Sequence, residues 1–349
     1  MFVRRYYEAE NRLVRRHTDN DYAYRCVVFG SGCYLQRSDA MKRVAVVTAS
    51  RADAGIYIPV IKALEKSSKV DYFLCSYETL TSKGDIVVVL GDTMPMLKAT
   101  IWASERNIIV AHIHGGDTTG SIDNKIRYAI TAFSDWHFPS LPEHALKLWE
   151  MGIPENRIKV VGPLGIYAMK DAEFISEGKL REDLGLSSKP IVIVLQHPVS
   201  TEVNQSEQQM KETLGAVISF DDIQPVVFYP NSENGSQDII KVILGYPFKT
   251  FKNLPYLHFV SLLKYSAVIV GNSSSGLVEA PLFGVPCVNI GTRQWGRISG
   301  RNIYNSGYDS REIIQQIQNA LHDGRELGKN PYALNIDGPS IIVKTLEKL

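Results

Sequence analysis

Short runs of β-branched and aliphatic residues alternate with segments of helical periodicity from residue 43 onward. This alternation is typical of βαβ units, in which helices cover both faces of a parallel sheet. The chain has 349 residues, 44% of them hydrophobic, which is enough to bury two cores. We therefore predict an α/β chain with two doubly wound, Rossmann-like halves. The expected strands are 43–48, 85–90, 108–112, 137–138, 159–161, 191–195, 225–229, 267–270 and 287–290, and residues 70–75 are also strand-like.

Changes in composition predict the domain boundaries. Residues 1–40 carry scattered arginines, tyrosines and acids, and we treat them as an extension of unknown role. The charged segment 170–188 has no strand character and suits a connection between two domains. We expect an N-terminal Rossmann-like domain over 41–169 and a C-terminal Rossmann-like domain over 170–335. Residues 336–349 are expected to form a helix that packs back on the N-terminal domain.

Charge, hydropathy and cysteine usage argue against several classes of protein. The formal net charge of +1 disfavours non-specific nucleic-acid binding, although a basic arm within residues 1–40 stays an open alternative. The sequence contains no apolar run near the ~18–20 residues of a membrane span. The four cysteines show no paired CxxC spacing, and Cys287 lies in an apolar run where a buried free thiol is expected. We expect a cytoplasmic protein that binds neither membrane nor metal.

Residues 268–297 are predicted to form a strand, a turn of small residues, a short helix and a second strand. The turn 271–276 consists of glycine, asparagine and serine, so its N–H groups and hydroxyls can converge at a helix N-terminus. Phosphate is favoured at such a position. Serines at this position more often simply cap a helix, so the turn by itself leaves both interpretations open.

Polar residues gather directly after predicted strands, which is where ligands bind in open α/β sheets. Each cluster has a structural alternative, because an aspartate in such a position can cap a helix and an arginine can pair with it. Taken together, the clusters fit one site better than separate caps. They are 50–53, 91–93, 112–117 with Asp123 and Arg127, 196–198, and the serine-rich turn with Glu279, Arg293 and Arg297.

These residues carry a family resemblance over most of 42–345. In order and spacing they resemble the hydrolysing UDP-N-acetylglucosamine 2-epimerases. The resemblance implies the GT-B architecture, with two Rossmann-like domains facing each other across a cleft and the nucleotide held mainly by the C-terminal domain, 170–335. The motifs are Arg51-Ala52-Asp53, Gly91-Asp92, His112-Ile113-His114-Gly115-Gly116-Asp117, Ser121-Ile122-Asp123, 126–131, 195–199, 229–231, 271–276 and 291–294.

The resemblance implies that UDP-N-acetylglucosamine is converted to UDP and N-acetylmannosamine, the entry to sialic-acid-type sugars. UDP is eliminated to leave a glycal, and water then adds with inversion at C2. It also implies a homo-oligomer, a dimer or tetramer, that needs no cofactor. Two alternatives stay open: an enzyme for another nucleotide-linked acetamido sugar of the legionaminic type, and a degenerate protein that only binds nucleotide-sugars. A non-hydrolysing epimerase and a GT-B glycosyltransferase fit the motifs less well.

The resemblance also implies roles for individual residues. Asp92 and Asp123 match catalytic carboxylates, Arg127 matches an arginine beside them, and His197 matches a histidine that reaches the diphosphate and sugar. Glu279 matches the carboxylate that accepts from the ribose hydroxyls. The expected nucleotide-binding residues are Arg51, Ser273, Ser274, Ser275, Gly276, Glu279 and Arg293.

Two features depart from the family pattern. His114 stands where relatives generally carry a catalytic glutamate, and Asp117 is the nearest acid. We favour His114 as the acid–base group, because histidine can transfer protons near neutral pH, and we keep Asp117 as the alternative. The second departure lies near 76–84, where the family has roughly fifty more residues, the length of one or two βα units. We therefore expect a shortened N-terminal sheet that lacks one neighbour and exposes apolar surface.

Overall fold

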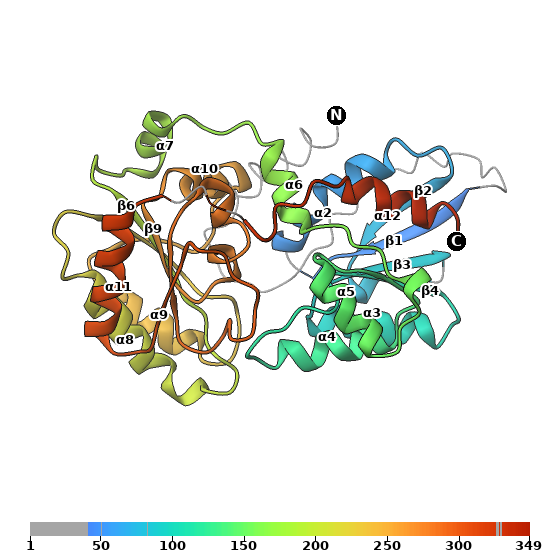
Figure 1. Cartoon of the computed structure of the whole chain (residues 1–349), viewed down its shortest axis with the longest axis horizontal. Helices are drawn as coiled ribbons and strands as arrows, with labels where there is room; N and C mark the ends of the chain where they lie inside the picture. Colours follow the sequence, from blue (N-terminus) through green and yellow to red (C-terminus); the bar gives the residue numbers. More distant parts are fainter. Residues whose placement is uncertain (1–40, 50, 82, 326–327, 329) are drawn as a thin grey trace. The chain divides into compact units, whose positions relative to one another are not determined.

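The computed structural model describes residues 41–49, 51–81, 83–325, 328 and 330–349. The predicted extension 1–40, with Cys26 and Cys33, lies outside the described residues. The strands form two separate parallel sheets, so the predicted α/β class is confirmed (Figure 1). The first sheet has the order β2-β1-β3-β4-β5. Its strands are β1 (Lys42–Val47), β2 (Val70–Cys75), β3 (Ile86–Leu90), β4 (Ile109–Ile113) and β5 (Trp136–Phe138).

Helices cover both faces of the first sheet. Figure 1 shows α2 (Arg51–Leu64) on one face and α3 (Met94–Ser104), α4 (Asp123–Ala132) and α5 (Pro142–Glu150) on the other. The central strand β3 between them is buried along its whole length, which explains its unbroken aliphatic sequence. The C-terminal helix α12 (Gly338–Leu346) contacts α2. The predicted domain boundaries themselves stay a prediction.

The second sheet has six strands in the order β11-β10-β9-β6-β7-β8. Its strands are β6 (Ile191–Leu195), β7 (Gln224–Phe228), β8 (Lys249–Phe251), β9 (Val268–Gly271), β10 (Cys287–Ile290) and β11 (Ile303–Ser306). The helices around it are α7 (Glu177–Leu184), α8 (Ser206–Val217), α9 (Ser236–Leu244), α10 (Tyr256–Tyr265) and α11 (Ser310–Asp323), and α6 (Leu164–Lys170) precedes them in the chain.

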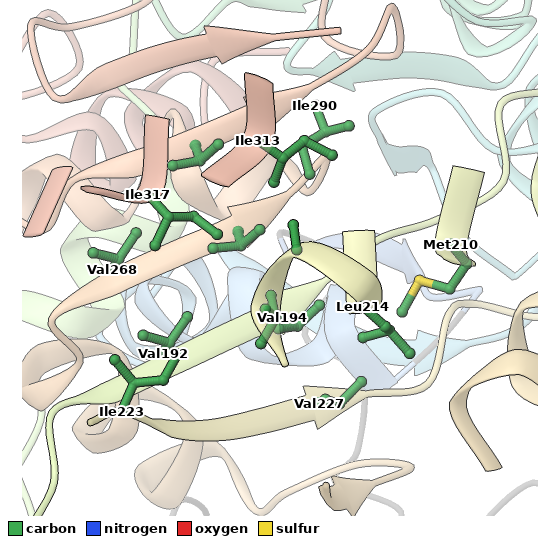
Figure 2. Packing of buried hydrophobic residues seen from close by; sticks show 14 of the residues in the cluster. Val192, Val194, Met210, Leu214, Ile223, Val227, Val268, Ile290, Ile313 and Ile317 are labelled. Atoms are coloured by element: carbon green, nitrogen blue, oxygen red, sulfur yellow. The ribbon is translucent and has the colours of Figure 1, made fainter. Parts of the chain in front are cut away.

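Alternate residues of β6 point to opposite faces of this sheet and enter two different cores. Val192 and Val194 pack with Met210, Leu214 and other buried residues of α8, α9 and α11 (Figure 2). Ile191 and Ile193 pack with buried residues of α7 and α10 on the other face. Burial on both faces is the physical reason that this strand reads as a continuous apolar run rather than an alternating one.

Most predicted strands are present within a residue or two of their expected bounds, but 159–161 is not a strand. Lys159 N–H donates to the His137 carbonyl at 2.9 Å and Val161 N–H to that of Pro139 at 2.9 Å, so the chain follows β5 without forming a ladder. Gly162, with φ of 73°, and Pro163 then end this segment. The short edge strands β8 and β11 have no matching prediction.

The helix predicted after the serine-rich turn is also wrong in type. Residues Ser274–Gly276 and Ala280–Phe283 form two short 3₁₀ helices. Pro281 has no N–H with which to extend an α-helical ladder, and Gly284, with φ of 68°, ends the second turn. An argument from a long helix macrodipole therefore fails here, and only local N–H groups and hydroxyls remain for an anion.

The connection from β2 to β3 occupies residues 76–85, and its described residues, 76–81 and 83–85, include only the 3₁₀ turn Tyr77–Thr79. Because β3 pairs with β1, the chain passes from the edge strand β2 to the other side of β1 without an intervening α-helix. Parallel crossovers usually contain one. β2 thus stays an edge strand, and its Leu74 is 38% exposed.

The remaining composition-based expectations concern membranes and thiols. Within the described residues, the helices are all too short or too polar to cross a bilayer. Cys287 is a buried free thiol, as expected, and burial raises its pKa to about 12.

Candidate active site

A cavity of about 210 Å³ lies where the carboxyl ends of strands from both sheets meet. The first sheet contributes the loops after β1, β3, β4 and β5, and the second contributes the loops after β9 and β10. The end of a parallel strand is the usual ligand position in such folds. The lining includes the predicted residues Asp92, His114, Asp117, Asp123, Arg127, Ser274, Glu279 and Arg293.

Asp92 and Arg127 form an ion pair in this cavity. Gly91, in the left-handed region with φ of 71°, turns the chain after β3 and places Asp92 at the cavity wall. Arg127, on α4, is only 2% exposed, contacts the Asp92 carboxylate and donates from Nη1 to the Asp117 carbonyl at 3.2 Å. Burial raises the pKa of Asp92, and the charge of Arg127 partly opposes that shift. Asp123, at the start of α4, accepts from Ser121 Oγ at 2.7 Å.

Asp117 is the centre of a second buried ion pair, which joins the loops after β4 and β10. Arg297 contacts its Oδ2, with Nε at 2.9 Å, and Thr118 N–H donates to Oδ1 at 2.8 Å. Burial alone would raise the pKa of Asp117, but the charges of Arg297, His144 and Arg127 outweigh it and lower the pKa to about 2. Asp117 is therefore ionised at neutral pH.

His114 lies in the cavity wall, but backbone groups hold its ring. Leu164 N–H donates to Nε2 at 3.2 Å, and the ring also hydrogen-bonds with backbone at Gly162. The residue has φ of 62°, uncommon for a residue with a side chain, and its own N–H donates to the Phe138 carbonyl at 2.9 Å. Burial lowers its pKa to about 4, so the ring is neutral at pH 7.

His197 is held by Asn272, a member of the predicted 271–276 turn to which the sequence assigned no contact with His197. Asn272 Oδ1 accepts from His197 N–H at 2.7 Å, and Asn272 Nδ2 donates to the His197 carbonyl at 2.8 Å. Asn231 N–H donates to Nδ1 of His197 at 3.2 Å, which fixes the neutral ring with its proton on Nε2. Burial, followed by the nearby charge of Arg293, lowers the pKa of His197 to about 3.

The predicted nucleotide-binding residues divide into two groups. Ser274, Glu279 and Arg293 line the cavity, and Arg293 donates to the Asn272 carbonyl at 3.2 Å. Burial raises the pKa of Glu279 to about 7, Arg297 partly offsets the rise, and Glu279 Oε2 is buried without a hydrogen-bond partner. The side chain of Arg51 lies outside what the structure describes. His197, Ser273, Ser275 and Gly276 do not contribute to the lining.

Ser273 and Gly276 have structural contacts instead. Ser273 Oγ accepts from Ser275 N–H at 3.3 Å, which is the capping interaction that the sequence left open. Gly276 faces Cys287, and a Cβ there would overlap the Cys287 sulfur.

Sequence reasoning did not single out three further residues. Tyr332 lines the cavity, and Ser140 and His144 form a hydrogen-bonded pair next to Asp117. Gln294, part of the 291–294 motif but given no role, also lines the cavity. For Ser140 and His144, the only signal in the sequence was the pair Gly115-Gly116, because two glycines leave room for a helix to pack beside the loop.

Gly120 allows the loop after β4 to dock on the loop after β10. Its N–H donates to the Arg293 carbonyl at 3.1 Å, and a Cβ would overlap the Thr292 carbonyl. We expect Gly120→Ala to destabilise the protein by about 1–3 kcal/mol through this overlap, as measured by urea unfolding. The control is Gly215→Ala in α8, where nothing lies within 4 Å and where alanine should stabilise by about 0.5–1 kcal/mol. If Gly120→Ala and the wild type had equal unfolding free energies, the close contact between the two loops at Gly120 would be contradicted.

Five buried histidines predict acid sensitivity. Burial lowers the pKa to about 3 for His112 and His197 and to about 4 for His114, His137 and His144. Their folded pKa values lie below the ordinary 6.5, so the unfolded chain binds protons first, and stability falls as the pH drops from 6.5 towards 4. Between pH 7 and 5.5, protonation of each of these histidines in the unfolded chain should lower the unfolding free energy by about 1 kcal/mol. Urea titrations at the two pH values would measure this loss. An unfolding free energy that is the same at both pH values would contradict the burial of these histidines.

Comparisons with known proteins agree with the geometry. The sequence model of the family described as UDP-N-acetylglucosamine 2-epimerase matches residues 75–338. The chain is 31% identical over 245 residues to the UDP-N-acetylglucosamine 2-epimerase of Neisseria meningitidis serogroup B, spanning 69% of this chain and 64% of that protein. It is 27% identical over 348 residues to the UDP-N,N'-diacetylbacillosamine 2-epimerase (hydrolyzing) of Legionella pneumophila, spanning 84% of this chain and 92% of that protein.

Solved structures show the same fold. The UDP-GlcNAc 2-epimerase of Neisseria meningitidis bound to UDP-GlcNAc superposes with a TM-score of 0.74 at 18% identity, covering 88% of this chain and 100% of that one. The Methanocaldococcus jannaschii UDP-GlcNAc 2-epimerase in complex with UDP-GlcNAc and UDP has a TM-score of 0.71 at 18% identity, with the same coverage. These likenesses confirm the predicted GT-B fold. Together with the match over 75–338, they lead to one conclusion: the chain belongs to the UDP-N-acetylglucosamine 2-epimerase family.

Proposed function

We propose that this protein is a hydrolysing 2-epimerase, which converts UDP-N-acetylglucosamine to UDP and N-acetylmannosamine. The observation that carries the proposal is the cavity, which is lined by Asp92 and Asp123 from the first sheet and by Ser274 and Arg293 from the second. The carboxylates suit proton transfer at C2 of a sugar. The hydroxyl and guanidinium donors suit a departing diphosphate.

The departing nucleotide carries a negatively charged diphosphate, so it requires hydrogen-bond donors rather than carboxylates around it. Arg293 and Ser274 line the nucleotide side and supply guanidinium and hydroxyl donors. Glu279 lies on the same side, where a ribose hydroxyl can donate to its unpartnered Oε2, whereas a phosphate would be repelled. These contacts support the order of ribose, diphosphate and sugar along the cavity.

Proton transfer at C2 is assigned to the carboxylates. Asp92 is a partly buried carboxylate, 29% exposed, whose pKa is raised by desolvation, which makes it a stronger base than a fully exposed aspartate. Asp123 lines the same cavity and is the second acid–base group. We assign His114 a structural role, in place of the acid–base role favoured from the sequence, because backbone groups occupy its ring.

A second substrate is supported by the relatives. Besides the Legionella protein, the GDP/UDP-N,N'-diacetylbacillosamine 2-epimerase (hydrolyzing) of Campylobacter jejuni is 30% identical over 275 residues, spanning 76% of this chain and 72% of that protein. A nucleotide-linked diacetamido sugar is therefore the alternative substrate. Homo-oligomerisation and a place in sialic-acid-type biosynthesis stay predictions from the family resemblance.

The decisive experiment is NMR of the full chain with each nucleotide-sugar in deuterated water. Free UDP together with N-acetylmannosamine deuterated at C2 would establish hydrolytic epimerisation through a C2 proton exchange. If the protein turns over only the diacetamido substrate, that sugar replaces N-acetylglucosamine as the proposed substrate. Retention of both substrates intact, with line broadening on binding, would support the degenerate binding protein and overturn the enzymatic proposal.

A further inference from the structure

Ser140, His144 and Asp117 form a chain of contacts whose two ends, Ser140 and Asp117, both line the cavity. Ser140 lines the cavity, and its Oγ lies 3.0 Å from Nδ1 of His144. Nε2 of His144 faces Asp117 Oδ1 at 3.3 Å. His144 is 1% exposed, and Ser140 and Asp117 are each 5% exposed, so water does not bridge these groups freely.

Local sequence explains how the three residues come together. β5 ends at Phe138, and α5 begins at Pro142, so Ser140 lies just before the helix and His144 in its first turn. Gly116, with φ of 79°, lies directly against the His144 carbonyl, which a Cβ would overlap. The glycine therefore allows α5 to approach the loop that carries Asp117.

Neighbouring charges hold Asp117 as an anion, and burial, which lowers the pKa of His144 to about 4, keeps His144 a neutral base. Arg297 and Arg127 are the cations near the carboxylate, and His114 is the other titratable group beside it. Lys147 and Arg297 disfavour protonation of His144, whereas Asp117 favours it. His144 Nε2 is buried without a hydrogen-bond partner in the resting state. Protonation of the ring turns its 3.3 Å contact with Asp117 into an ion pair.

We propose that Ser140, His144 and Asp117 form a proton relay that activates the water added to the glycal. This inference rests on the proposed hydrolytic function and concerns its second half. An acid of the cavity protonates C2, and the water oxygen forms a bond to C1. The water gives one proton to Ser140 Oγ, while the Ser140 hydroxyl proton passes to His144 Nδ1. His144 then carries the positive charge beside Asp117 until, after the sugar leaves, the proton returns through Ser140 to water in the cavity, so one water is added in total.

The relay explains why a histidine can replace the family glutamate at position 114 without loss of a base. Ser140 is the only relay member that contacts the reacting water, and His144 and Asp117 act through it as positioning residues. Elimination of UDP does not involve the relay, because that step removes the C2 proton and needs no water. Loss of the relay should therefore separate UDP release from sugar formation.

The test is the product ratio in Ser140→Ala and His144→Gln compared with the wild-type chain. NMR would follow UDP, the glycal and the free sugar from the nucleotide-sugar that the wild type turns over. We expect UDP release within about threefold of wild type, sugar formation slower by about a hundredfold, and accumulation of glycal. The matched control is His258→Gln, which removes another histidine–aspartate contact, 3.5 Å from Asp183, outside the cavity.

The outcomes separate the relay from the proposed function. A wild-type chain that releases no UDP from any nucleotide-sugar overturns the proposed function. An active wild type whose Ser140→Ala variant loses UDP release and sugar formation by the same factor, or loses neither, overturns the relay. UDP calorimetry and thermal unfolding verify that each variant folds, and Ser140→Ala, which deletes only a hydroxyl, decides the matter if His144→Gln does not fold.

Discussion

Asp92→Asn should reduce turnover by at least about a hundredfold and leave UDP affinity within about twofold of wild type. The amide keeps the size of the side chain and can still contact Arg127, but it cannot accept the C2 proton. The serine-rich loop that is proposed to hold the nucleotide belongs to the second sheet, whereas Asp92 follows β3 in the first. Turnover by NMR and UDP binding by calorimetry would measure the two effects separately.

Ser274→Ala is the matched comparison for this prediction. It should weaken UDP binding by about 1–3 kcal/mol, the cost of one charge-assisted hydrogen bond. If Asp92→Asn instead lost UDP affinity as its main effect, the carboxylate would belong to the nucleotide side of the cavity, and the assignment of the C2 base would be wrong.

Arg297→Met should lower the unfolding free energy by about 3–5 kcal/mol, because it leaves the Asp117 carboxylate buried without its main partner. Addition of Asp117→Asn should recover much of this loss, since the double variant buries no unpaired charge. Urea unfolding at pH 7 of the two single variants and the double variant gives the coupling free energy. Additive losses would show that the two side chains do not stabilise each other.

The ion pair between Asp117 and Arg297 also predicts that the unfolding free energy of the wild type falls at acidic pH. The folded pKa of Asp117, about 2, lies below its ordinary 3.8, so the carboxylate contributes about 2 kcal/mol at neutral pH. This contribution is present above pH 4 and is lost as the pH falls towards 2. It should be absent from Arg297→Met, in which burial dominates and the pKa of Asp117 moves upward.

Strand periodicity predicted the two sheets well because central parallel strands are buried on both faces. β3 and β6 read as unbroken aliphatic runs for this reason, and their bounds agree closely with the prediction. The edge strands β8 and β11 are short and partly exposed, so their sequences carry little of this signal. Prolines changed the predicted helix after β9 into 3₁₀ turns, which residue periodicity alone does not reveal.

The sequence by itself determined that Asp92, Asp117, Asp123 and Ser274 lie at one edge of their sheets, because polar residues that follow parallel strands share the carboxyl end. Only the tertiary structure decided which side chains pair. Arg297 contacts Asp117, although the two residues are 180 positions apart in the sequence. Gly116 lets α5 pack close to its loop, so that His144 faces the same carboxylate. Such contacts depend on distances between loops of different elements, and residue spacing along the chain does not encode them. The hydrogen bonds of the His114 ring were decided in the same way, by the backbone position of Leu164.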